Sequence, residues 1–237
     1  MDIESSKQVI EMICYIHYMI SNDPDRSDQI FREIYDRLQS SSLLQKLSDV
    51  KIVTVGNHKS LKTNFGEYEK AQQVDHKENV FEYEFPTLSR VYQDAQLLDG
   101  DTPILYLHLK GASKPKNHSD DSWRERMMVG VLDKHVECLE SLQNIRVVGI
   151  DLARVKMNDG ETCPAYTGNF WWSSARHLSS LPDPSVESIK KSHGHLVKSR
   201  TSKNPSSPRG DNHRYLAEFW VCMNNLDNPA GLSVLSV

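Results

Sequence analysis

The stretch Ile104-Leu105-Tyr106-Leu107-His108-Leu109-Lys110-Gly111 decides the fold class of this chain. Its first part is almost continuously apolar or aromatic, and the Lys-Gly pair ends the run. A short apolar run of this kind is typical of a strand that is buried on both faces. Lys110 and Gly111 would then stand at the carboxyl end of that strand.

Three similar runs occur elsewhere, at Met12–Ile20, Lys51–Val55 and Arg146–Ile150. Between the runs, apolar residues recur at helical spacing. These helical segments cover residues 25–38, 86–95 and 120–142. Strands that alternate with helices predict an α/β fold with a mostly parallel central sheet flanked by helices. In such sheets ligands bind beyond the carboxyl ends of the strands.

The bulk composition describes an ordinary soluble protein. The chain has 237 residues, a net charge of −4, 38% hydrophobic and 25% charged residues. We treat residues 1–237 as one domain, and the acidic charge gives no reason to expect nucleic acid as a partner. No run reaches the roughly 20 apolar residues of a membrane helix. The start, Met1 to Glu4, lacks the basic residues of a secretory signal, so we expect a cytoplasmic protein. Nothing indicates an oligomer, and a monomer is the default.

The four cysteines are widely scattered. They form no C-x-x-C pair, which disfavours a zinc site or a disulfide framework and fits buried reduced thiols. A cysteine nucleophile stays open. The residues are Cys14, Cys138, Cys163 and Cys222.

A second informative block is Gly168-Asn169-Phe170-Trp171-Trp172. Neighbouring side chains point in different directions, so we expect one indole to be buried and the other to face a cleft. An indole beside amide and carboxylate groups offers a surface for the apolar face of a sugar ring. The alternative is that both rings belong to the core.

The end of the chain carries Arg214-Tyr215-Leu216-Ala217-Glu218-Phe219-Trp220. Before it, residues 185–212 are rich in Ser, Pro, Lys and His, with almost no apolar residues. Such a segment cannot bury enough surface to order itself, so we expect a flexible basic loop there.

Taken in order, these blocks resemble a family of small glycosyltransferase-like proteins of the GT-A type, found in bacteria and in large DNA viruses, including those of algae. The resemblance runs from about Met12 to Trp220, and the HxKG and GNFWW blocks are its most specific parts. The blocks are His17-Tyr18, Phe85-Pro86-Thr87-Leu88, Leu105–Gly111, Trp123-Arg124, Gly168–Trp172, Leu181-Pro182 and Ala217–Trp220.

The resemblance implies a single Rossmann-like domain that binds a nucleotide-sugar donor, such as a UDP-hexose, near the first strands. The sugar would pass to a hydroxyl group of a glycan or another acceptor. The residues expected near the donor and its phosphates are His17, His108, Lys110, Gly111 and Arg124. Lys110 at a strand end suits a diphosphate directly. The alternative is that His108 is a packed core residue and Lys110 a solvated loop charge.

GT-A enzymes usually hold a divalent metal, Mn²⁺ or Mg²⁺, with a D-x-D motif. The residue types of Asp99-Gly100-Asp101 match that motif. It precedes its strand, whereas the usual motif follows one, and Asp-Gly-Asp is also a common turn sequence.

Transfer also needs a carboxylate, which either takes the proton of the attacking hydroxyl or steadies the cationic sugar centre. Glu218 lies among aromatic residues and is the first candidate; its alternative role is an ion pair with Arg214. Asp151, just after a strand, is the rival. The residues expected to bind sugar or acceptor are Gly168, Asn169, Trp171, Trp172 and Arg214.

The chain also departs from the family pattern. Ala165 stands where a histidine-type ligand is expected before the Gly-Asn block. This departure and the displaced Asp99-Gly100-Asp101 keep a second hypothesis open, a nucleotide- or carbohydrate-binding module without turnover. The chain has no G-x-G-x-x-G or G-x-x-x-x-G-K-[ST] motif, which disfavours dinucleotide dehydrogenases and P-loop NTPases.

Overall fold

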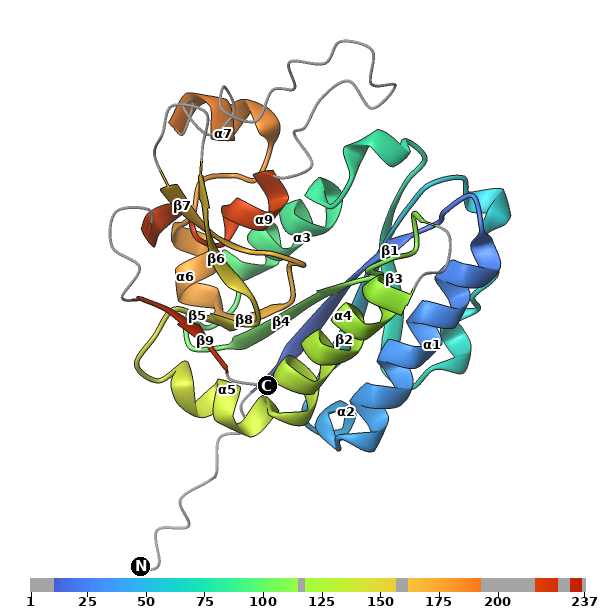
Figure 1. Ribbon diagram of the computed structural model, residues 1–237, viewed down its shortest axis with the longest axis horizontal. Helices are drawn as coiled ribbons and strands as arrows, with labels where there is room; N and C mark the ends of the chain where they lie inside the picture. Colours follow the sequence, from blue (N-terminus) through green and yellow to red (C-terminus); the bar gives the residue numbers. More distant parts are fainter. Residues whose placement is uncertain (1–10, 115–117, 157–161, 193–215, 226–230, 236–237) are drawn as a thin grey trace, which may run out of the picture.

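The computed structural model describes residues 11–114, 118–156, 162–192, 216–225 and 231–235 (Figure 1). The strands are β1 (Ile13–Met19), β2 (Asp49–Val55), β3 (Ala71–Lys77), β4 (Pro103–His108), β5 (Val147–Gly149), β6 (Leu152–Lys156), β7 (Thr162–Tyr166), β8 (Trp171–Ser174) and β9 (Leu232–Val234). The α-helices are α1 (Pro24–Ser40), α2 (Leu43–Lys46), α3 (Phe85–Ala95), α4 (His118–Met128), α5 (His135–Ser141), α6 (Ala175–Ser180), α7 (Val186–Ser192) and α9 (Leu216–Trp220). The short turns are η1 (His58–Ser60), η2 (Phe65–Glu67), η3 (Val80–Glu82), η4 (Val129–Asp133) and η6 (Met223–Asn225).

The central sheet has seven strands in the order β3-β2-β1-β4-β8-β5-β9. The first four strands are parallel to one another, and β8 runs antiparallel between β4 and β5. A separate antiparallel pair, β6 and β7, lies beside this sheet. The prediction of a mostly parallel sheet flanked by helices is therefore confirmed.

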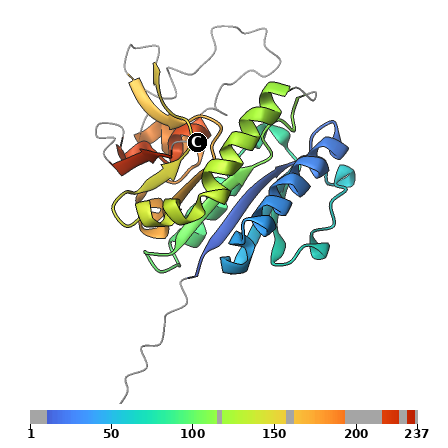
Figure 2. The ribbon, with the colours of Figure 1, turned by 60° about the horizontal axis from the view of Figure 1, so that its bottom comes forward.

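Each face of the sheet has its own apolar core. Helices α1 and α4 cover one face, while α3 and α6 cover the other (Figures 1 and 2). Along β4, Leu105 and Leu107 enter the first core, whereas Ile104 and Tyr106 enter the second. The apolar run that opens the sequence argument is thus a strand buried on both faces, as expected.

The tryptophan pair lies within this sheet. Trp171 and Trp172 occupy β8 and are both fully buried, one in each core. The expectation that one ring faces a cleft is wrong, because alternate side chains of a central strand enter opposite cores when helices cover both faces. The indole nitrogen of Trp172 donates to the carbonyl of Val131 at 2.8 Å, which ties β8 to the helix above it.

The long helix predicted for residues 120–142 is divided into α4, a π-helical turn (η4) and α5. A π turn carries more residues than an α turn, so it changes the phase of the residues that follow. After the turn the predicted apolar stripe is confirmed only in part, since Leu139 and Leu142 still pack against the first core. Val136, in contrast, is exposed, and Cys138 is buried instead.

Two other expectations need correction. The predicted loop 185–212 begins with helix α7, whose Ile189 is fully buried in the second core. One apolar side chain is enough to dock that segment, and residues 193–212 lie outside the described residues. Strand β3 was not anticipated, because its sequence AQQVDHK lacks an apolar run.

Among the described residues, every helix is too short or too polar to cross a lipid bilayer.

The turn that leads into β8 depends on two residues with positive φ. Gly168 has φ +95° and Asn169 has φ +54°. A Cβ atom on Gly168 would lie 2.5 Å from the sulfur of Met127, so this position has neither conformational nor spatial room for a side chain.

We therefore expect Gly168→Ala to lower the free energy of unfolding by at least about 2 kcal/mol, since it adds backbone strain to overpacking. Gly66→Ala is the matched control, because a Cβ there meets its nearest neighbour at 3.4 Å. Urea denaturation of both variants checks this. Equal stability of the two variants would contradict the role assigned to Gly168.

Candidate functional site

A pocket lies at the carboxyl ends of β1 and β4, where an α/β sheet is expected to bind ligands. Its imidazole, carboxyl and ammonium groups come from His17, Glu84, His108, Lys110, Lys114 and Glu218. The cavity measures about 130 Å³. Ligand pockets for drug-sized molecules are typically about 300–1,000 Å³, so this one takes one small polar group or one end of a larger substrate.

Two histidines stand side by side at the base of the pocket. His17 and His108 are paired across β1 and β4. Nδ1 of His17 lies 2.9 Å from the hydroxyl of Thr87, and burial lowers the pKa of His17 to about 4. Burial also lowers the pKa of His108, and the ammonium of Lys110 adds to this effect while the Glu84 carboxylate opposes it. Both rings are therefore neutral at pH 7.

Glu84 brings a carboxylate to the same place. It precedes helix α3, and one of its oxygens accepts hydrogen bonds from Tyr106 Oη and Asn169 Nδ2, each at 2.7 Å. Burial alone would raise the pKa of Glu84, but the histidines and these two donors lower it overall. The side chain is 16% exposed and lines the pocket, so a charged oxygen is available there.

Lys110 provides a cation. Its ammonium nitrogen lies 3.8 Å from the centre of the Trp123 ring. Burial lowers the pKa of Lys110, and the charges of Glu218 and Glu84 oppose that shift. Glu218, from α9, thus reaches the same pocket from the far end of the sequence. The structure brings together His17, His108, Lys110, Gly111 and Glu218, as predicted from the sequence.

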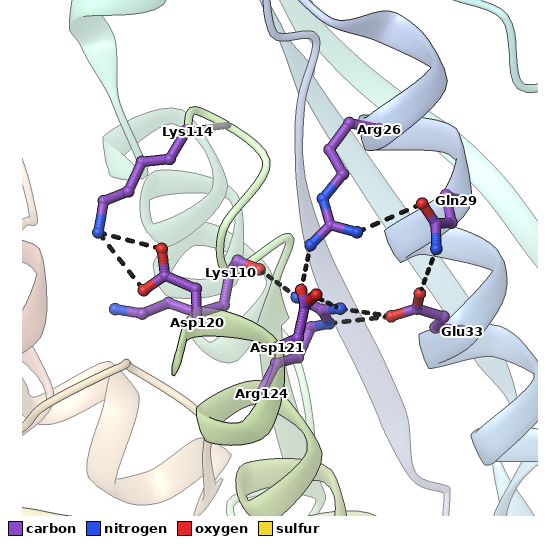
Figure 3. A network of polar contacts seen from close by, with 8 residues as sticks. All are labelled: Arg26, Gln29, Glu33, Lys110, Lys114, Asp120, Asp121 and Arg124. Atoms are coloured by element: carbon purple, nitrogen blue, oxygen red, sulfur yellow. Dashed lines mark hydrogen bonds and ion pairs between the residues drawn. The ribbon is translucent and has the colours of Figure 1, made fainter. Parts of the chain in front are cut away.

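Arg124 has a different position from the one predicted. It is 2% exposed, is absent from the pocket lining, and donates to the Lys110 carbonyl at 2.9 Å (Figure 3). It also pairs with Glu33 at 2.5 Å and with Asp121 at 3.1 Å. Its expected contact with a phosphate is corrected, because these partners already use the guanidinium group.

The Asp99-Gly100-Asp101 motif lies at the wrong edge of the sheet. It precedes β4, whereas the pocket follows β4, so roughly 20 Å of strand separates them. Asp99 caps the local turn by accepting from the Asp101 amide at 2.9 Å, and Asp101 pairs with Arg176. The residues do not fit a metal, and in the described parts of the chain no cluster of three metal-ligating side chains occurs.

The remaining predicted residues lie behind the pocket or outside the described residues. Asp151 accepts from Trp123 Nε1 and from Arg126, each at 2.6 Å, and is absent from the pocket lining. Trp171 and Trp172 are sealed in the cores, which corrects their predicted contact with a sugar. Arg214 falls outside the described residues.

Gly168 and Asn169 support the site from behind. The Gly168 carbonyl lies 2.6 Å from Nε2 of His108. The Asn169 side chain donates to Glu84 and accepts from Trp171 Nε1 at 2.8 Å, and it is 1% exposed. The predicted contact of Asn169 with a sugar is therefore also corrected, since both ends of its amide bond to the protein.

Three residues that line the pocket were not predicted from the sequence, namely Glu84, Tyr83 and Lys114. Tyr83 lines the pocket with an unusual backbone (φ +51°, ψ −131°), and its ring contacts that of Phe81, which is 60% exposed. The signal that could have found Glu84 is its place just before Phe85-Pro86, a helix start.

A family model described as "Domain of unknown function (DUF8361)" matches residues 15–224. The chain belongs to this family. The match begins within β1 and extends beyond α9, so it includes every residue that lines the pocket. No curated protein matches the chain significantly.

Two solved structures are weakly similar to the chain. A 4-diphosphocytidyl-2C-methyl-D-erythritol synthase from Anaerococcus prevotii DSM 20548 is 8% identical, with a TM-score of 0.39 over 95% of this chain and 88% of that one. A 2-C-methyl-D-erythritol 4-phosphate cytidylyltransferase from Francisella tularensis is 11% identical, with a TM-score of 0.43 over 94% and 90%. At these scores, neither likeness supports an inference about activity.

Arg124→Leu should lower the free energy of unfolding by about 3 kcal/mol, because it leaves Glu33, Asp121 and the Lys110 carbonyl without their shared partner. Arg32→Leu removes an exposed arginine from an i,i+4 pair and should change stability little. Thermal and urea unfolding of both variants measure this. A stable Arg124→Leu protein with weakened phosphate binding would instead restore the role predicted from the sequence.

His17 makes stability depend on pH. Its pKa of about 4 in the folded protein is below the unfolded value near 6.5, so the unfolded chain takes up a proton first. The contribution is complete above pH 6.5 and is lost as pH falls toward 4, by at most about 3 kcal/mol. Urea unfolding at pH 7 and pH 4.5 should show this loss. His17→Gln should reduce the difference between the two pH values, and an unchanged difference would rule out His17 as its source.

Proposed function

We propose that this protein transfers a sugar from a nucleotide-sugar donor, such as a UDP-hexose, to a hydroxyl group of a glycan or similar acceptor. The observation that carries the proposal is the meeting of Lys110, two neutral histidines and two glutamates in one pocket at the carboxyl edge of the sheet. Such transfer needs a cation for the leaving phosphate, a proton acceptor and a carboxylate near the sugar centre.

Lys110 is the cation that would face the leaving phosphate. Its ammonium is partly buried, so a nearby phosphate charge is screened less than it would be in water. Lys114 also lines the pocket, where it pairs with Asp120 at 3.3 Å. The cavity of about 130 Å³ admits only the reacting end of the donor. The rest of the donor would therefore extend past the rim, beside Tyr83.

Glu218 is the carboxylate that would steady the positive charge on the sugar centre. It lines the same pocket as Lys110 and acts on Lys110 electrostatically, which supports a role close to the bond between sugar and phosphate. The alternative function is a binding module that holds the nucleotide sugar without turnover. The displaced Asp99-Gly100-Asp101 is the observation that keeps this alternative.

Incubation with a panel of UDP- and GDP-sugars, with and without Mn²⁺, tests the proposal through release of free nucleotide. We expect slow release from at least one donor. Lys110→Ala should weaken nucleotide affinity about 10- to 100-fold, since a charged hydrogen bond contributes about 1.5–3 kcal/mol. Lys62→Ala, which removes an exposed lysine paired with Asp25, is the control.

Glu218→Gln should reduce release about 100-fold and leave donor binding unchanged. Calorimetry measures the binding, and a coupled assay measures the release. Binding without release for every donor, with candidate glycans present, would favour the binding module. Release at the original rate from Glu218→Gln would remove Glu218 from catalysis.

A further inference from the structure

The tautomer of His108 is fixed by its surroundings. Nε2 of His108 lies 2.6 Å from the carbonyl oxygen of Gly168. A carbonyl oxygen can only accept, so Nε2 must carry the hydrogen. In the neutral ring the lone pair is then on Nδ1. Nδ1 is therefore a hydrogen-bond acceptor.

That acceptor faces a second one. Nδ1 of His108 lies 3.9 Å from Oε1 of Glu84, too far for a direct hydrogen bond. The other oxygen of Glu84 already accepts from Tyr106 and Asn169, which fixes the direction of the carboxylate. Both residues line the pocket. Two adjacent acceptors with no proton between them form an electrostatically unfavourable pair, and a group with an O–H bond relieves it.

We propose that Glu84 and His108 together bind the hydroxyl group of the acceptor and take up its proton. The inference rests on the proposed function and deepens it, because it places the acceptor oxygen beside His108 and leaves the diphosphate to Lys110. It also separates the roles of the two glutamates. Glu84 serves the incoming hydroxyl, and Glu218 serves the sugar centre.

The chemical step balances with these groups. The acceptor oxygen forms a bond to the anomeric carbon of the donor sugar as the bond from that carbon to the diphosphate oxygen breaks. The electron pair of the broken bond leaves with the nucleoside diphosphate, whose charge faces Lys110. The hydroxyl proton passes to Nδ1 of His108, and the resulting imidazolium pairs with Glu84.

Glu84→Gln is the decisive variant. The new amide can place an N–H group toward Nδ1 of His108, so it would occupy the acceptor pair from within the protein. With a donor that the nucleotide-sugar panel identifies, and with water in place of the acceptor, release should fall at least about 100-fold while donor affinity is unchanged. Glu82→Gln changes the same charge two residues away, outside the pocket lining, and should keep the original rate.

The pH profile separates a proton acceptor from a structural residue. The charged or titratable groups around the pair are His17, Tyr106 and Lys110, with Glu218 acting on Lys110. The rate should fall on acidification, when His108 becomes protonated, and burial shifts this fall below the ordinary range of an imidazole because it lowers the pKa of His108. Glu84 raises the pKa of His108. In the Glu84→Gln variant, the fall of the residual rate on acidification should therefore begin at a lower pH than in the wild-type protein. A full rate whose pH dependence is unchanged would overturn the proposal.

Nitrogen-15 NMR of the wild-type protein tests the pair even if no nucleotide sugar is turned over. We expect the Nε2–H form of His108 at pH 7.5, and a saturable shift of its Nδ1 resonance on titration with glycerol, used as a hydroxyl probe. Glu84→Gln should abolish that shift. An Nδ1–H form, or no response to glycerol, would overturn the acceptor pair, whereas failure of the donor panel alone would overturn only the proposed sugar transfer.

Discussion

The arrangement of the pocket depends on the side-chain amide of Asn169. Its nitrogen donates to Glu84 and its oxygen accepts from the indole of Trp171, so the amide has one favourable orientation. Trp171 stacks on Tyr106 with ring centres 4.9 Å apart, and the Tyr106 hydroxyl also donates to Glu84. The core and the pocket therefore share one closed set of buried polar contacts. Such a set is costly to leave half satisfied, which makes the direction of the Glu84 carboxylate a property of the fold.

These contacts give the Gly168-Asn169 block a structural role, whereas its sequence suggests a ligand-binding role. The block holds His108 through a backbone carbonyl and Glu84 through an amide. Both contacts need positive φ at neighbouring residues. The residues that resemble a binding motif thus support the pocket from behind, and the side chains that line the pocket come from other segments.

Much of the fold could be predicted from the sequence, because apolar runs and helical periodicity report burial directly. Strands β1, β2, β4 and β5 were found in this way. Strand β3 could not be found, since an edge strand with the sequence AQQVDHK buries little apolar surface. Strand β8 was misjudged for the opposite reason. Its two tryptophans need a core on each side, and sequence alone does not reveal that a strand far along the chain inserts beside β4.

The same limits explain the candidate site. Lys110, His108 and Glu218 were found because strand ends and aromatic neighbours are visible in the sequence. Glu84 was missed, since its position in the pocket depends on contacts to residues 22 and 85 positions away. The direction of β4 explains why Asp99-Gly100-Asp101 lies away from the pocket. A parallel strand has one ligand-binding end, and a motif that precedes the strand lies at the other.

The π-helical turn η4 holds one more residue than an ordinary α turn, so the apolar positions beyond it are shifted by one residue in the sequence. Removing a single residue from Val129–Asp133 would convert the wide turn into an α turn and leave the helix beyond it in phase. The change would fall on the turn itself, where the Val131 carbonyl receives the Trp172 indole. The residue count of this turn is thus tied to a strand more than 40 positions later in the chain.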